Sequence, residues 1–345
     1  MQQLSNLDVF FLCREFTESL AGSRFVNFYE TGGVFRFKFN NGENLLLDLK
    51  KSVFLSRKFA EAEGSPSPFV VFFRKALDNA RFAKASQVNQ DRILCLEFEK
   101  KEKFFVVLEL FREGNILLCD SNWVIQEALN KAEYASRTLK KWRGYVHPPS
   151  GKKNVEELAQ GDLPAKGPLL PMLSKAVNLS PFYLEEACFR AGLAFDEKNV
   201  SEKDANKLLE SMKELFVDFF PCVYYQEEKP VAFSVCRLKK MQASIVAKAF
   251  PSLSAALAEY YSQDFEVKKQ SKQDFILGQQ QAALGQLAEK SLEARQKAEW
   301  IYENFTLVEK LLGKAKEGAS QEELNLLSEG LCKVEKKARE LVVET

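Results

Sequence analysis

The stretch "DRILCLEFE" (91–99) decides the fold class. From Ile93 onward it is a short run of large apolar residues bounded by polar ones, which is typical of a buried strand. The turn-like "FREGN" (111–115) joins two further runs of this kind. Similar short segments lie at 24–30, 34–40, 44–49, 81–89, 103–111 and 115–120. The sequence therefore predicts an antiparallel β layer, in which the many Phe residues at alternating positions form the core.

Two helices accompany these strands. Ser5, followed by Asp8 and an apolar-periodic run, predicts a capped helix start, and Gly22 ends the run. Ser67 and Pro68 suit the N-cap and first-turn positions of a second helix. We expect residues 1–135 to form a β-sandwich that carries both helices.

The rest of the chain divides by composition and periodicity. Pro, Gly and Lys mark a linker, whereas short amphipathic segments opened by Ser180-Pro181 and by Ser201 favour a helix-hairpin-helix arrangement. The expected units are a linker at 136–167, a helix-hairpin-helix domain at 168–220, a strand pair with a connecting helix at 221–263, and a truncated coiled-coil arm with a helical hairpin at 264–345. The overall fold class is α+β.

The C-terminal arm is predicted from a heptad-like pattern. Its first helix carries Leu284, Leu287, Ala294, Ala298, Ile301, Phe305, Val308 and Leu312. Gly318 ends this helix, and Ser320 with Glu323 predicts a capping box for a second one. That second helix is expected to continue through Leu324, Leu327, Leu331, Val334, Ala338 and Leu341.

Bulk composition limits the function classes. In 345 residues, 49 Lys and Arg balance 48 Asp and Glu, so the net charge of +1 gives no global basic field, and nucleic-acid binding must rely on local patches. The N-terminal sequence lacks a signal peptide or membrane-span pattern, which predicts a cytoplasmic protein without a membrane partner. Its seven cysteines have no C-x-x-C spacing and are interpreted as reduced core thiols.

Common catalytic arrangements have little support. His147 is the single histidine and lies in "YVHPPSG", so Ser-His or Cys-His pairs and the usual histidine-containing zinc sites are not expected. No glycine loop suited to cradling phosphate is present in the sequence. We therefore expect neither a cofactor nor a metal, and interpret His147 as a surface-loop residue.

Several collinear stretches resemble the NFACT family of ribosome-associated quality control proteins, of the RqcH and NEMF type. They are "LSNLDV", "GSRFVNFYE" with "LLLDL", "SPSPFVVFFRKAL", "DRILCLEFE", "LELFREGNILL", "SPFYLEEACFRAGL", "FPSLSAALAEYY" and "AEWIYENFTLVEKLL". The resemblance covers the N-terminal half of a typical member and implies a first domain similar to formamidopyrimidine-DNA glycosylases. It further implies a non-enzymatic protein that binds the large ribosomal subunit with peptidyl-tRNA and recruits incoming aminoacyl-tRNA for untemplated tailing, the ribosome itself making the bond.

The resemblance also implies a tRNA-binding site at Asp8, Asp91 and Arg92. Arg can stack on a base and fork onto phosphate, while a neighbouring Asp can accept from exocyclic amines or hold the Arg rotamer. From the residues alone, the pair Asp91-Arg92 is interpreted as a turn acid with a strand-end salt bridge, and the resemblance favours the tRNA role instead. Asp8 also has a structural role at the first helix, and both roles are compatible. "FREGN" matches the family too, but we interpret it as a turn outside the site.

Three alternatives remain at this stage. A DNA glycosylase would need an N-terminal proline amine, whereas this chain begins Met1-Gln2-Gln3, so we expect no DNA partner. An adhesin, suggested by the family's older fibronectin-binding label, would need export and fits seven unpaired cysteines poorly. A coiled-coil scaffold that binds another ribonucleoprotein without recruiting tRNA is the main alternative.

Overall fold

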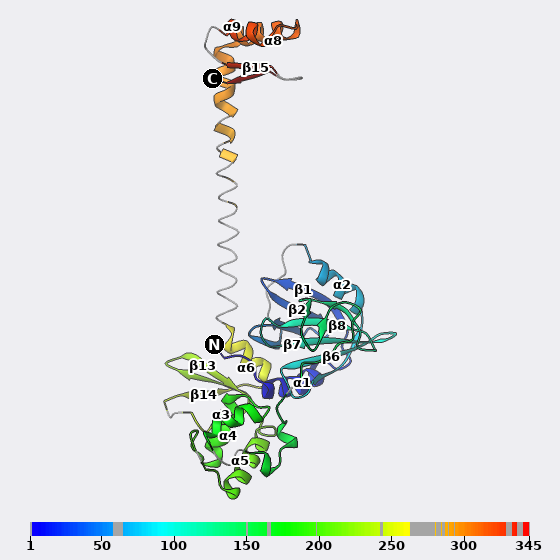
Figure 1. Cartoon of the computed structure of the whole chain (residues 1–345), viewed down its shortest axis with the longest axis vertical. Helices are drawn as coiled ribbons and strands as arrows, with labels where there is room; N and C mark the ends of the chain where they lie inside the picture. Colours follow the sequence, from blue (N-terminus) through cyan, green and yellow to red (C-terminus); the bar gives the residue numbers. More distant parts are fainter. Residues whose placement is uncertain are drawn as a thin grey trace. The chain divides into compact units, whose positions relative to one another are not determined.

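The structure is a computed structural model, shown in Figure 1, and it divides into the units Met1–Lys268 and Lys269–Thr345. The residues described are 2–57, 65–149, 151–163, 167–197, 199–241, 244–262, 280, 284, 287–288, 290–292, 294–328, 333–336 and 341–344. Each unit is described by itself.

The first unit confirms the predicted antiparallel strands (Figure 1). A four-stranded sheet has the order β1 (Phe25–Thr31), β2 (Val34–Phe39), β3 (Asn44–Asp48), β4 (Ser52–Ser56). A five-stranded sheet has the order β5 (Arg81–Gln87), β6 (Ile93–Glu99), β7 (Lys103–Glu109), β8 (Asn115–Cys119), β9 (Ile125–Ala128). Each strand pairs with its neighbour in sequence, so short turns make all the connections within these two sheets.

Phenylalanine rings join the two sheets. The ring of Phe98 on β6 lies 6.3 Å from that of Phe25 on β1 and 6.3 Å from that of Phe39 on β2. Phe39 also meets Phe82 of β5 at 5.9 Å, and these rings are buried. Burial of one such side chain contributes about 1.5–3 kcal/mol. The alternating Phe residues are thus core, as the sequence predicts.

Both predicted helices are present. In α1 (Asn6–Leu20), Ser5 and Asp8 form the expected capping box, and the apolar face packs against β5. In α2 (Pro68–Leu77), the Ser67 hydroxyl accepts from the amide of Val70, and the ring of Phe73 packs 5.1 Å from that of Phe28 on β1. The helix starts are fixed by short polar signals that sequence analysis can identify.

The segment predicted as a linker, 136–167, is packed over much of its described length. It holds one strand of the pair β10 (Ala132–Glu133) and β11 (Thr138–Leu139), and the 3-10 turns η1 (Val155–Glu157) and η2 (Gln160–Asp162). Leu139 and Tyr145 cover the outer face of the five-stranded sheet, where Tyr145 and Phe105 flank Trp123. We call residues 134–148 the strap, because they run back over this face.

A buried ion pair ties the strap to β7. The guanidinium of Arg137 forms a bidentate pair with the carboxylate of Glu109, and both side chains are 4% exposed. The hydroxyl of Tyr145 donates to the same carboxylate at 3.0 Å. Breaking one partner of such a buried pair is strongly destabilising, so the strap is held firmly.

Helices and a small sheet complete the first unit. The helices are α3 (Leu169–Ala176), α4 (Pro181–Ala191), α5 (Glu202–Glu214) and α6 (Leu253–Tyr260). The predicted strand pair is β12 (Cys222–Gln226) with β13 (Lys229–Ser234), and an unpredicted third strand, β14 (Val246–Ala249), pairs with β12. All residues of β14 are exposed, so it has no apolar alternation to identify it. The helix-hairpin-helix assignment stays a prediction.

The second unit corrects the predicted C-terminal hairpin. It contains α8 (Phe305–Lys316) and α9 (Gln321–Leu327), with the predicted Ser320–Glu323 capping box and a contact between buried Leu311 and Leu324. The second helix was expected to reach 344, but after α9 the chain forms the antiparallel pair β15 (Lys333–Lys336) and β16 (Leu341–Glu344).

The physical reason is that apolar residues spaced alternately by three and four stabilise a helix only when a partner helix covers them. Here Val334 pairs in register with Val343, and β-branched residues favour strands. Residues 264–279, which belong to the predicted arm, lie outside the described residues, as does most of 281–289.

Other sequence expectations concern membranes, metals and thiols. No described helix is both long and apolar enough to cross a bilayer. Among the described residues, no cluster of three or more His, Cys, Asp or Glu is arranged to hold a metal ion. The described cysteines are buried and free, as predicted, while Cys332 lies outside the described residues.

Candidate nucleic-acid interface

The turn between β5 and β6 presents the predicted pair. Asn89 and Gln90 both adopt left-handed backbone conformations, with φ of 51° and 49°. The amide of Asp91 donates to the carbonyl of Val88 at 2.9 Å, which closes the turn. Asn is among the residues that accept this conformation most readily, whereas Gln does so less often, so the turn needs support from outside.

That support comes from three amide side chains, two of which are distant in sequence. The side chain of Asn6, in the first turn of α1, donates to the carbonyl of Gln90 at 3.2 Å. The side chain of Asn178, between α3 and α4, donates to the carbonyls of Asn89 and Gln90, both at 3.1 Å. Gln87 donates to the carbonyls of Asn6 and Asp91 at 2.7 and 2.8 Å. The turn is therefore held in one geometry before any ligand binds.

Sequence analysis missed these supporting residues. Asn6 and Asn178 are single polar residues beside helix ends, where amides commonly serve as local caps. Their bonds to the turn join positions 84 to 89 residues apart. No local pattern identifies such partners, so only the three-dimensional structure reveals them.

Asp91 and Arg92 do not form the strand-end salt bridge that was the alternative interpretation. The carboxylate of Asp91 accepts from the backbone amide of Arg92 at 2.7 Å. The guanidinium of Arg92 makes no hydrogen bond or ion pair within the described part of the chain, although the backbone carbonyl of Arg92 accepts from Leu110 at 2.8 Å. Arg92 thus combines a fixed backbone with an uncommitted charged group.

Two hollows meet at this pair. One, of about 370 Å³, lies beside the starts of α1 and α4; besides Asp91 and Arg92 its lining includes Gln3, Ser5, Asn6, Lys152, Asn178, Ser180 and Phe182. The other, of about 360 Å³, is lined by Asp91, Arg92, Phe111, Arg112, Tyr134, Ser136, Arg137 and Pro148. We call them the helix-start hollow and the strap hollow. Asp91 and Arg92 line both.

The helix-start hollow suits an anion. Ser5 caps α1, and Ser180 is the N-cap residue of α4, so amide-rich helix starts border the same space. Helix N-termini carry partial positive charge, to which Arg92 and Lys152 add. The hydroxyl oxygen of Ser180 is buried and has no hydrogen-bond partner among the described residues. A phosphate group of a nucleic acid fits this combination of charge and donors.

Asp8, the third predicted site residue, lies elsewhere. It is 0% exposed and lines neither hollow. Its carboxylate accepts from the amide of Ser5 at 2.7 Å and from the hydroxyl of Tyr183 on α4 at 2.7 Å. Burial raises the pKa of Asp8 to about 6, although these hydrogen bonds act in the opposite direction. The structure brings Asp91 and Arg92 together and places Asp8 inside the protein, where it joins α1 to α4.

Two further sequence interpretations can be compared with the structure. His147 is exposed in an irregular segment, as predicted for a loop residue. "FREGN" does form the turn between β7 and β8, but its Phe111 and Arg112 also line the strap hollow opposite Arg92. The turn interpretation was correct, and the structure adds that the turn borders this hollow.

Comparisons with known proteins agree with this organisation. The family described as "NFACT N-terminal and middle domains" matches residues 6–342. An archaeal Rqc2 homolog, aRqcH of Methanocaldococcus jannaschii, is 27% identical over 288 residues, which are 76% of this chain and 43% of that protein. Ribosome quality control complex subunit 2 of Saccharomyces cerevisiae is 37% identical over 127 residues, 35% of this chain and 12% of that protein. The chain thus spans less than half the length of these relatives.

Solved structures share the fold. The fibrinogen binding protein from Staphylococcus aureus matches with a TM-score of 0.60 and 18% identity, over 74% of this chain and 98% of that one. The N-terminal part of the fibronectin/fibrinogen-binding protein from Streptococcus suis matches with a TM-score of 0.56 and 18% identity, over 76% and 100%. At this identity the likeness concerns the fold alone.

Proposed function

The chain belongs to the NFACT family, and from that premise we propose that it acts in ribosome-associated quality control. In this proposal it binds a large ribosomal subunit that still carries peptidyl-tRNA and recruits an incoming aminoacyl-tRNA for untemplated C-terminal tailing of the stalled chain. It is a binding factor and not an enzyme, because the ribosome forms the peptide bond.

The observation that carries the tRNA contact is the uncommitted guanidinium of Arg92 between the two hollows. A planar guanidinium can stack on a base and donate two parallel hydrogen bonds to phosphate. Asp91 does not neutralise this group directly, because its carboxylate bonds the backbone amide of Arg92. The net charge of +1 makes such a local feature necessary for RNA binding.

The supported turn adds preorganisation. Because Asn6, Gln87 and Asn178 already bond the backbone of residues 89–91, little ordering remains to be done when RNA binds. Ordering a loop on binding costs affinity, so a turn ordered beforehand binds more tightly for the same contacts. The proposed site is therefore a rigid turn that carries the uncommitted guanidinium of Arg92.

Co-sedimentation tests the proposal. The chain should pellet with purified large subunits that carry peptidyl-tRNA and much less with intact ribosomes, and binding should weaken steeply with salt because phosphate contacts release counterions. Equal binding to both particles would remove the selectivity for the large subunit. Binding to large subunits without any tRNA dependence would instead support the scaffold that binds ribonucleoprotein without recruiting tRNA.

A further inference from the structure

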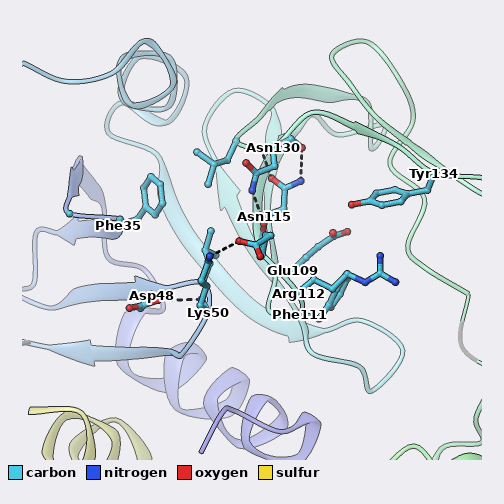
Figure 2. A pocket seen from close by; sticks show the side chains of 15 residues that line it. Phe35, Asp48, Lys50, Glu109, Phe111, Arg112, Asn115, Asn130 and Tyr134 are labelled. Atoms are coloured by element: carbon cyan, nitrogen blue, oxygen red, sulfur yellow. Dashed lines mark hydrogen bonds and ion pairs between the residues drawn. The ribbon is translucent and has the colours of Figure 1, made fainter. Parts of the chain in front are cut away.

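A third hollow, of about 750 Å³, adjoins the strap hollow and shares Phe111, Arg112 and Tyr134 with it. We call it the β7–β8 hollow, because the turn between these strands forms one wall. Figure 2 shows Tyr134 and Arg112 on one side of this space and Phe35 on the other. The shared lining residues make a continuous track from Arg92 through the strap hollow into the β7–β8 hollow.

Arg112 stands where these two hollows meet. Its side chain is exposed and makes no hydrogen bond or ion pair among the residues that the structure describes. Arg112 has a positive φ of 55°. At Gly114, φ is +73° and an added Cβ would lie 2.4 Å from the Cβ of Leu49. The turn is thus pressed against the end of β3, which fixes where Arg112 projects.

Tyr134 supplies an aromatic surface with firm support. Its ring is 45% exposed, and the guanidinium of Arg137 lies 5.2 Å from the ring centroid. Arg137 is itself held by the buried carboxylate of Glu109. An exposed ring that is anchored from behind loses little conformational freedom when a flat ligand stacks on it.

The polar groups around this hollow are mostly committed to each other. Asn115 donates to the carbonyl of Asn130 at 2.9 Å, and Asn130 donates to the carbonyl of Gly114 at 2.8 Å. Lys50 pairs with Glu113 at 2.5 Å. Each of these side chains therefore already has a partner within the protein, and the hollow adds to them a ring face and the charge of Arg112.

We propose that the β7–β8 hollow holds one unstacked nucleotide of single-stranded RNA, with its base on Tyr134 and its phosphate at Arg112. The RNA is the same molecule that contacts Arg92, so this inference rests on the proposed function. Stacking accepts every base because each has a π face, whereas specificity would need free hydrogen-bonding groups. The contact is consequently tolerant of base identity. An acidic peptide would bind the charge of Arg112 but would gain nothing by stacking on the ring of Tyr134, so the exposed ring favours RNA.

Fluorescence anisotropy with labelled single-stranded RNA octamers of U, A or C tests the proposal on the full chain. Tyr134→Ala should weaken binding of all three by about fivefold or more, the lower range for loss of one stacked base. Tyr134→Phe should bind like wild type, because the ring remains. Arg112→Ala should weaken binding and reduce its salt dependence by about one phosphate contact.

Matched controls are Trp142→Ala and Arg14→Ala, both at exposed positions that line none of these hollows. Both should bind RNA like wild type, and thermal melting should show all variants folded. The inference is overturned if Tyr134→Ala binds normally, if Tyr134→Phe loses as much as Tyr134→Ala, if one base is strongly preferred, or if polyglutamate competes as well as RNA.

Arg92→Ala separates this inference from the proposed function. If Arg92→Ala loses tRNA binding while Tyr134→Ala and Arg112→Ala do not lose octamer binding, the track ends at the strap hollow and this inference fails alone. If Tyr134→Ala loses octamer binding but Arg92→Ala recruits tRNA normally, the proposed tRNA site fails and the nucleotide site stands.

Discussion

The start of α1 and the turn between β5 and β6 carry the two acids expected in one site, yet they use them in opposite ways. Asp8 is buried, with its carboxylate bonded to Ser5 and Tyr183 and its pKa raised to about 6. Asp91 is partly exposed, with its carboxylate bonded to the next backbone amide. The same residue type serves to join two helices in one region and to border two surface hollows in the other.

This difference teaches that proximity to a site does not imply contact with its ligand. Ser5 and Asn6 line the helix-start hollow, whereas Asp8 lies one helical turn further along and faces inward. In the proposed tRNA site, Asp8 would act only through the helix starts that it joins, whereas Asp91 and Arg92 line the hollows directly.

The largest expected effect is the loss of stability in Asp8→Ala. The buried amide of Ser5 and the hydroxyl of Tyr183 lose a partner, and orphaned buried donors cost roughly 1–3 kcal/mol each. We expect the free energy of unfolding in urea to fall by about 4 kcal/mol at pH 4, where the protonated carboxyl contributes most. Asp91→Ala is the matched control and should change it by less than about 1 kcal/mol. Equal stability losses in both variants would erase the distinction between the two acids.

The second prediction concerns pH and the same buried carboxyl. Because burial raises its pKa from 3.8 to about 6, the folded state binds more protons than the unfolded state between these values. The stability that Asp8 contributes is therefore present below pH 4 and falls as pH rises through 6. The unfolding free energy of wild type minus that of Asp8→Asn should decrease by up to about 3 kcal/mol from pH 4 to pH 7.

The comparison with Asp8→Asn removes titrations common to both proteins, such as that of Glu15, whose pKa is also raised by burial. If the difference in unfolding free energy between wild type and Asp8→Asn stays constant with pH, the pKa of Asp8 is the same in the folded and unfolded states. Urea melts at several pH values provide the measurement.

The third prediction concerns the exposed pair. Asp91→Ala with Arg92→Ala should weaken tRNA recruitment to large subunits by about 1–3 kcal/mol, because a stacked and phosphate-bound arginine is lost. Stability should change by no more than roughly 1 kcal/mol, since no apolar core is removed. Normal recruitment by this folded double variant would exclude the turn from the tRNA site.

The smallest effect distinguishes a charge from a planar contact. Arg92→Lys keeps the positive charge but loses the planar fork, so a stacked or bidentate contact should weaken by about 1 kcal/mol. A simple electrostatic contact would tolerate the change. Filter binding of tRNA separates these outcomes through the affinity of Arg92→Lys relative to wild type. Because the charge is kept, the salt dependence should stay the same in either case, which measurements at two salt concentrations check.

Local sequence signals predicted much of the fold. The caps at Ser5, Ser67 and Ser320 are short patterns with a direct physical basis, and each begins a helix in the structure. The strands from 24 to 119 follow from apolar alternation between turns. These elements depend on residues that are close in sequence, so one sequence is enough to predict them.

Other features depend on distant partners. The Pro, Gly and Lys composition of 136–167 indicated a linker, although Arg137 and Tyr145 find Glu109 in the fold. The exposed strand β14 lacks any apolar pattern. The helix expected beyond Leu327 relied on a spacing without a partner helix. In the candidate site, the pair Asp91-Arg92 was identified through a family resemblance. Its support by Asn178 could not be predicted, because the two are far apart in sequence.

The bonds from Asn178 to the turn have a consequence for dissecting the protein into pieces. A fragment of residues 1–135 would retain both sheets and the pair Asp91-Arg92. It would lack Asn178, which donates to the carbonyls of Asn89 and Gln90. Two consecutive residues with positive φ would then lose two of the three side-chain hydrogen bonds that Asn6 and Asn178 donate to their carbonyls, and would relax toward commoner backbone angles. A fragment that keeps the geometry of this turn is thus longer than the sheet that displays it, and must extend at least to Asn178, just before α4.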